Sequence, residues 1–147
     1  MSYKTVLLHV ADDAHLEAHA DYATRLARLF DSRLLGLTCH RPSPWPQDGA
    51  VAFLGGDPLT VELRAAEEAA VAREATFLRR CRLAEVTSFE AIREDAASAT
   101  AICERALGAD LVLLEQPEPA TKAYAERRAV VDAVLADSPR PVLMLPY

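Results

Sequence analysis

The chain has little glycine, and the few glycines are placed where they exclude several kinds of site. Of five glycines, three lie within 49–56 and the others are Gly36 and Gly108. Phosphate-binding loops and dinucleotide fingerprints need several closely spaced glycines between a strand and a helix. No such spacing follows an apolar run here, so the sequence predicts neither a Walker loop nor a Rossmann glycine fingerprint.

Cysteines and long apolar runs are also scarce. Cys39, Cys81 and Cys103 are odd in number and form no CxxC pair, which argues against a disulfide framework or a zinc site and predicts buried free thiols. No segment approaches the roughly 20 apolar residues of a membrane span. The opening MSYKTVLLHV lacks the basic start and cleavage site of a signal peptide. We therefore expect a cytoplasmic protein without a membrane partner.

Basic residues are outnumbered, since 16 lysines and arginines face 22 acidic residues and give a formal net charge of −6. A field of that sign repels nucleic acid and anionic lipid, so no nucleic-acid partner is expected. The 147 residues, about half of them apolar, fit one domain over 1–147 with a single hydrophobic core.

Apolar periodicity divides the chain into alternating strands and helices. The strands are expected at 6–10, 33–39, 86–93, 110–114 and 141–145, and the helices at 14–30, 59–81, 99–106 and 125–136. This alternation predicts an α/β fold, a doubly wound five-stranded parallel sheet with four helices. The first and fourth strands are the most apolar and belong in the middle, whereas the polar third strand suits an edge.

A long loop at 41–57 interrupts this pattern. It holds three of the nine prolines and the apolar residues Trp45, Phe53 and Leu54. Loops of this length in a compact domain are usually functional or mobile. The loop is expected either to act as a lid or partner surface, or to be pinned to its own domain by these three side chains.

Three stretches resemble the universal stress protein A family. YKTVLLHVADDAHLEAHADYATRLA is similar to its opening strand, acidic turn and alanine-rich helix; GADLVLLEQPEP is similar to its fourth strand, and ADSPRPVLMLPY to its ending. The resemblance covers essentially the whole chain. It implies a Rossmann-like sheet in the order 3-2-1-4-5, a homodimer, and a regulatory or protective role in stress response.

The nucleotide motif of this family is absent from the chain. Members that bind ATP carry an aspartate after the first strand and a G-x-x-G-(nine residues)-G-S/T stretch after the fourth. These positions fall on Ala11, Glu115, Glu118, Arg128 and Ala129. A Cβ at the glycine positions obstructs the approach of backbone to phosphate, and carboxylates add repulsion. We therefore expect no ATP binding and no cofactor.

Two alternatives to this interpretation stay open. In the first, the chain is an atypical nucleotide-binding universal stress protein in which Arg127 and Arg128 replace the glycine cradle, although these arginines are more readily expected to pair with nearby glutamates. In the second, it is an enzyme or an electron-transfer subunit on the same scaffold. No catalytic residue and no metal site can be assigned, because no acid–base or metal-ligand spacing is found.

Some residues are expected to lie near a remodelled cleft, where a small ligand or a protein partner could bind. The cleft candidates are Asp12, His40, Gln116, Arg127 and Arg128. His9 is expected to be a core histidine bonded to backbone, and His15 and His19 to lie on a solvated helix face. Arg79, Arg80 and Arg82 are expected to pair along their own helix.

The last strand predicts the dimer interface. Val142, Leu143, Met144 and Leu145 carry no charge and are flanked by proline only at their ends. In the order 3-2-1-4-5 this strand lies at an edge, where proteins normally place charge or a covering element. We expect a second copy to pair with it antiparallel about a two-fold axis.

Overall fold

The computed structural model describes residues 3–11, 14–41 and 57–147, with side chains from 60 onward in the last range. Strands and helices alternate along these residues. In chain order they are β1 (Thr5–His9), α1 (Leu16–Phe30), β2 (Arg33–Cys39), α2 (Asp57–Leu83), β3 (Phe89–Glu94), α3 (Ser98–Ala106), β4 (Leu111–Glu115), α4 (Tyr124–Asp137) and β5 (Val142–Leu145). The strands form one parallel sheet in the order β3-β2-β1-β4-β5, as the sequence predicted.

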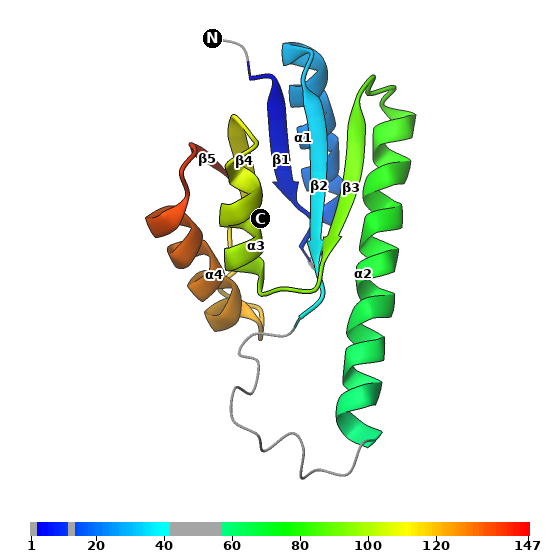
Figure 1. Ribbon diagram of the computed structural model, residues 1–147, viewed down its shortest axis with the longest axis vertical. Helices are drawn as coiled ribbons and strands as arrows, with labels where there is room; N and C mark the ends of the chain where they lie inside the picture. The colour runs from blue at the N-terminus through cyan, green and yellow to red at the C-terminus, as the bar shows by residue number, and fades with distance from the viewer. Residues whose placement is uncertain (1–2, 12–13, 42–56) are drawn as a thin grey trace.

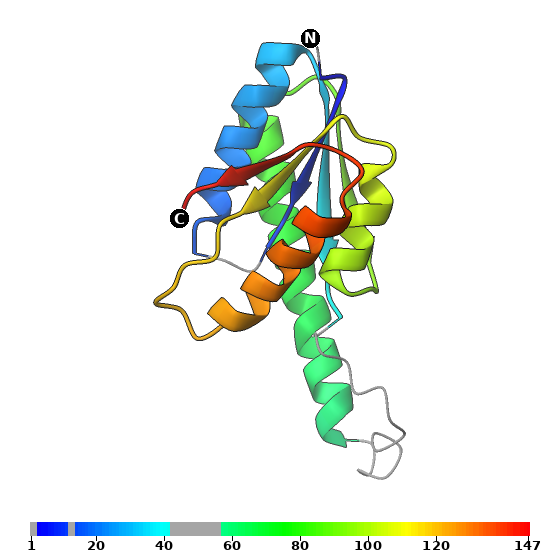
Figure 2. The same ribbon diagram turned by 90° about the vertical axis from the view of Figure 1, so that its left-hand side faces the viewer.

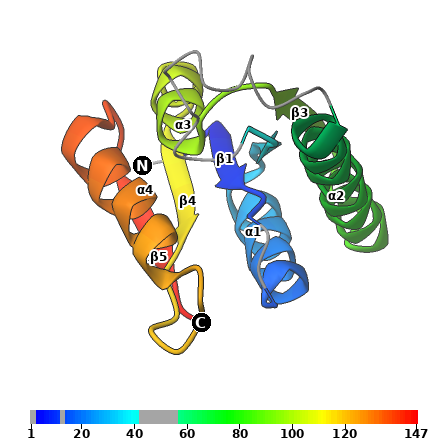
Figure 3. The same ribbon diagram turned by 90° about the horizontal axis from the view of Figure 1, so that it is seen from below.

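Helices cover both faces of the sheet. Helices α1 and α2 lie on one face, and α3 and α4 lie on the other (Figure 1 and Figure 3). Side chains of β1 alternate between two cores, since Val6 and Leu8 pack toward α1 and α2 whereas Leu7 packs toward α3 and α4. Burial on both faces explains why this strand reads as a continuous apolar run.

The third strand begins later than the sequence predicted. The expected start at Val86 is wrong, because β3 begins at Phe89. Glu85 adopts a left-handed conformation with φ of 53°, and Val86 N–H donates to the carbonyl of Cys81 at 3.1 Å. These residues therefore terminate α2, although a left-handed helix end is usually signalled by glycine.

Helix α2 extends beyond the sheet and supplies one wall of the region beyond the strand ends. Its 27 residues run past the carboxyl ends of the strands (Figure 1 and Figure 2). No helix of the described residues is long and apolar enough to cross a bilayer. The predicted loop at 41–57 lies, except for Arg41 and Asp57, outside the described residues.

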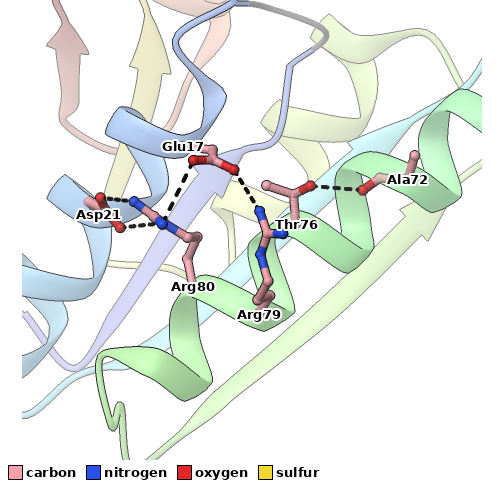
Figure 4. A network of polar contacts seen from close by, with 6 residues as sticks. All are labelled: Glu17, Asp21, Ala72, Thr76, Arg79 and Arg80. Atoms are coloured by element: carbon pink, nitrogen blue, oxygen red, sulfur yellow. Dashed lines mark hydrogen bonds and ion pairs between the residues drawn. The ribbon is translucent and has the colours of Figure 1, made fainter.

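The arginines near the end of α2 hold it to α1. Arg79 donates to Glu17 at 2.5 Å, and Arg80 forms a two-pronged contact with Asp21, with its Nε 2.7 Å from Oδ1 (Figure 4). The expected pairing of these two arginines along their own helix is therefore wrong. Because the contacts are largely exposed, they fix the approach of the two helices more than they add to stability.

A substitution at Gly36 tests how closely α2 packs on the sheet. An added Cβ would lie 2.5 Å from the ring of Phe77, a side chain that is fully buried. We expect Gly36→Ala to lower the free energy of unfolding by about 1–3 kcal/mol through overpacking, measured by urea denaturation. Gly108→Ala is the matched control, because its nearest neighbour would be an ordinary contact at 3.8 Å. Equal stability of the two variants would contradict this account.

Candidate functional site

A cavity of about 290 Å³ opens where β1, β2 and β4 end. In parallel α/β sheets this edge is where ligands bind. The lining comes from three strand ends and three helices: His9, Val10, Ala11, Cys39, His40, Arg41, Ala66, Ala69, Arg73, Ser98, Glu115, Ala123, Glu126, Arg127 and Val130. The cavity therefore combines apolar walls with several cationic side chains.

A buried ion pair forms the floor of this cavity. His9 Nδ1 lies 2.9 Å and 3.1 Å from the two carboxylate oxygens of Glu115, and the residues are 8% and 3% exposed. Burial by itself raises the pKa of the Glu115 carboxyl, but the charge and hydrogen bond of His9 more than offset this and the pKa ends below its usual value. The expectation that His9 bonds to backbone is therefore wrong.

Arginines and a histidine form the polar side of the cavity. Arg73 donates to the carbonyl of Cys39 at 2.7 Å. Arg41 makes two hydrogen bonds to Asp95, at 3.2 Å and 3.1 Å, and these hold the pKa of that carboxyl below its usual range. His40 Nε2 lies 3.7 Å from Asp95. The other ring nitrogen, Nδ1, is buried and has no hydrogen-bond partner in the described part of the chain.

The one cysteine in the described lining is not activated as a nucleophile. Burial raises the pKa of the Cys39 thiol to about 11, so this thiol stays protonated and is a poor nucleophile at neutral pH. Over residues 3–11, 14–41 and 57–147, no group of three or more potential ligand side chains could hold a metal ion.

Two of the cleft candidates, His40 and Arg127, line the cavity. Two positions of the missing nucleotide motif, Ala11 and Glu115, line it as well. Arg128 instead pairs with Asp132 on the outer side of α4, at 2.8 Å, so its expected pairing with a neighbouring glutamate is wrong.

The remaining candidates lie elsewhere. Gln116 is exposed and its N–H donates to the carbonyl of Leu145 at 2.8 Å. Glu118 lies 3.8 Å from His15, and Ala129 is exposed on α4. Asp12 falls outside the described residues.

Sequence reasoning missed Arg73, which approaches the cavity from α2. Ala66, Ala69 and Arg73 recur at three- and four-residue spacing, so they share one face of the helix. This spacing was a usable signal, since it places an arginine on the same helix face as two small residues.

His19 also differs from the expectation of a solvated pair. It is 6% exposed, and its Nε2 donates to the carbonyl of Pro146 at 3.0 Å. Only His15 is partly exposed. Helix α1 therefore holds the residue that follows β5 through this hydrogen bond.

Comparisons with known proteins agree with the fold. No protein-family model matches the chain, and no curated protein matches its sequence. Among solved structures, the universal stress protein UspA from Lactobacillus plantarum superposes with a TM-score of 0.74 at 15% identity, over 99% of both chains. A universal stress protein in complex with cAMP gives a TM-score of 0.62 at 21% identity, covering 99% of this chain and 98% of that one.

A third similar structure is a universal stress protein from Archaeoglobus fulgidus in complex with dAMP. It has a TM-score of 0.58 at 13% identity and covers 98% of each chain. At these identities the likeness establishes a shared fold, a Rossmann-like five-stranded sheet of the universal stress type.

The buried ion pair predicts a pH-dependent contribution to stability. We expect Glu115→Gln to lower the free energy of unfolding by about 3–5 kcal/mol at pH 7, because His9 loses the buried carboxylate that it contacts. The folded pKa of Glu115 is depressed, so its contribution is full above the unfolded value of about 4.3 and is lost as the pH falls through the folded pKa. Urea denaturation from pH 7 to pH 3 measures both effects.

Glu118→Gln is the control for this measurement. Its partly exposed carboxylate lies 3.8 Å from His15, so the expected loss is below about 1 kcal/mol. A similar loss in the two variants would show that burial of the His9–Glu115 pair is not what matters.

Proposed function

We propose that this chain is a universal stress-type protein with a regulatory or protective role in stress response, acting as a cytoplasmic homodimer whose cleft does not bind ATP. The fold it shares with universal stress proteins over nearly its whole length supports the first part. Three free cysteines support a reducing compartment. The observation that carries the ATP proposal is the turn after β4, which lacks glycine and in which two backbone N–H groups are already hydrogen-bonded.

Two backbone N–H groups of this turn are already engaged. Gln116 N–H donates to Leu145 at 2.8 Å, and Thr121 N–H donates to Glu118 at 3.1 Å. Phosphate cradles need such N–H groups pointing at the ligand. Repulsion by Glu115 is a weaker reason than the sequence suggested, because its carboxylate pairs with His9. Occupied N–H groups and the missing glycines are the stronger support.

An atypical nucleotide site is the second candidate function. Two structures of the same fold are complexes with cAMP and dAMP, and Arg127 lines the cavity. This hypothesis also needs Arg128, but Arg128 pairs with Asp132 instead. Only Arg127 of the two would then be placed to contact a phosphate.

A catalytic or electron-transfer role has less support. Burial raises the pKa of Cys39 to about 11 and that of Cys81 to about 12, so neither thiol is activated. Fold alone gives no warrant for an enzyme activity. We therefore propose a binding function for the cavity.

The dimer proposal rests on the open edge of β5. Val112 and Gln116 donate to the carbonyls of Pro141 and Leu145, and the alternation of a parallel ladder then turns the N–H and C=O of Val142 and Met144 away from β4. Antiparallel pairing with a second copy would satisfy these groups. Val142, Leu143 and Met144 are partly buried in the single chain, whereas Leu145 belongs to its core.

ATP binding is tested by calorimetric titration. We expect a dissociation constant no tighter than about 1 mM, or about −4 kcal/mol, because the turn after β4 presents no phosphate cradle. AMP and cAMP are titrated in parallel, and micromolar binding of either would favour the second candidate. A low micromolar constant for ATP itself would overturn the proposal.

The dimer is tested by sedimentation at micromolar concentration, where we expect two copies per particle. Met144→Pro should give folded monomers, because it removes an outward N–H while leaving the β4–β5 ladder its donors. Met144→Ala is the matched control, since it shortens the same side chain and keeps the N–H. A monomeric wild-type chain, or a dimer that survives Met144→Pro, would contradict this interface.

A further inference from the structure

The half of α2 that lies beyond the sheet has an exposed side that faces away from the core. This half runs past the carboxyl ends of the strands (Figure 1 and Figure 2). Exposed residues recur along it at alternating steps of three and four, and they are called the α2 seam here: Val61, Arg64, Glu68, Val71 and Ala75. This is the heptad spacing by which two helices pack together. Val61 is 64% exposed and Val71 is 46% exposed, so the α2 seam leaves apolar surface in water.

The centre of the α2 seam carries two opposite charges that have no ion-pair partner among the described residues. Glu74, Arg79 and Arg80, farther along the same helix, pair with residues of β3 and α1. No ion pair within the described residues involves Arg64 or Glu68. Both signs of charge are therefore available to another molecule on one short surface.

An antiparallel copy of the α2 seam is complementary to it. A two-fold axis beside Ala66 places Val61 opposite Val71 of the second copy, and every such contact occurs twice. The same axis places Arg64 opposite Glu68 of the second copy. In a parallel two-fold pair each residue would instead meet its own copy, so that Arg64 would face Arg64 and Glu68 would face Glu68. Charge therefore selects the antiparallel arrangement.

The position of this axis also keeps the two molecules from colliding. Ala66 lines the cavity and so lies beyond the ends of the strands, whereas Phe77 and Cys81 belong to the core beneath the sheet. An antiparallel pair centred on Ala66 therefore carries its two sheets at opposite ends. Helix α2 packs on β2 and β3, and β5 lies at the other edge of the sheet, so both surfaces can be occupied at once.

From this pattern we propose that the α2 seam is a self-association surface, at which a second copy of the chain pairs antiparallel through Val61, Arg64, Glu68 and Val71. The contact area is small, so the association is weak, with a dissociation constant of about 0.1–1 mM. This inference goes beyond the proposed function. Together with pairing at β5, it would join dimers into larger assemblies.

Sedimentation of the full chain at about 5 μM and at about 0.5 mM measures this association. We expect the mean mass per particle to rise between the two concentrations, whether the particle at low concentration is a monomer or a dimer. A mass that stays constant would overturn the proposal.

Charge reversal identifies the α2 seam as the surface. Arg64→Glu and Glu68→Arg should each weaken the association about tenfold or more, because each variant creates two like-charge contacts. An equimolar mixture of these two variants should restore it to within about threefold, since each chain then supplies the charge that the other lacks. Thermal unfolding checks that both variants are folded. A mixture that associates no better than its components would overturn the proposal.

Glu62→Arg is the matched control for net charge. Glu62 is exposed but falls outside the spacing of three and four, so it lies on another side of the helix. This variant should associate within about twofold of the wild type, and it should not rescue Arg64→Glu in a mixture. Either result in the opposite direction would assign the effects to overall charge and not to the α2 seam.

Met144→Pro separates this contact from the β5 interface. The α2 seam is unchanged in that variant, so we expect the rise in mass with concentration to persist. A rise that disappears in Met144→Pro would belong to β5 and would overturn the α2 proposal. Loss of the micromolar dimer alone concerns only the β5 interface.

Discussion

The contact between His9 and Glu115 is the physical constraint on the polar lining of this cavity. A carboxylate that is 3% exposed costs several kcal/mol of desolvation unless a charged or hydrogen-bonding partner meets it. His9 supplies that partner from the neighbouring strand, with both carboxylate oxygens within 3.1 Å. Neither member can change alone without leaving a buried polar group of the other without its partner. This contact therefore occupies the lining of the cavity where β1 and β4 end.

Much of the fold could be predicted from the sequence, because a strand buried on both faces appears as a continuous apolar run. The apolar runs at Val6–Val10 and Leu111–Leu114 correctly indicated central strands, and the polar third strand correctly indicated an edge. The His9–Glu115 pair could not be read in the same way. Side chains alternate between the two faces along a strand, so residues two apart lie on the same face. Leu7 faces α3 and α4 whereas Leu113 faces α1 and α2. The alternation therefore assigns His9, two residues after Leu7, and Glu115, two residues after Leu113, to opposite faces. They meet only because both strands end there. The late start of β3 was missed for another local reason, since Glu85 takes a left-handed conformation without being glycine.

Helix starts supply positive potential at this edge of the sheet, although no glycine-rich turn follows β4. The starts of α3 and α4 still face the cavity, because the topology brings every helix that follows a strand to the carboxyl ends of the strands. With backbone N–H groups of the turn engaged by β5 and by the turn itself, specificity passes to side chains. Arginine and histidine side chains therefore supply much of the polar lining at this edge of the sheet.

The two edges of the sheet are protected in different ways, and this difference determines which of them is available for a partner. On β3, Glu90 pairs with Arg33 and Arg93 lies 3.7 Å from Glu74 of α2, so charge and an adjacent helix occupy that edge. Charged side chains on an edge strand oppose pairing with another chain, because the partner would have to desolvate them. Strand β5 has no charged residue, and Val142 and Met144 turn their backbone groups outward. His19 holds the residue after β5 against α1, which fixes the strand in place. An uncharged edge whose backbone groups point outward therefore supports the proposed pairing of β5 with a second copy, whereas the charged edge at β3 opposes such pairing.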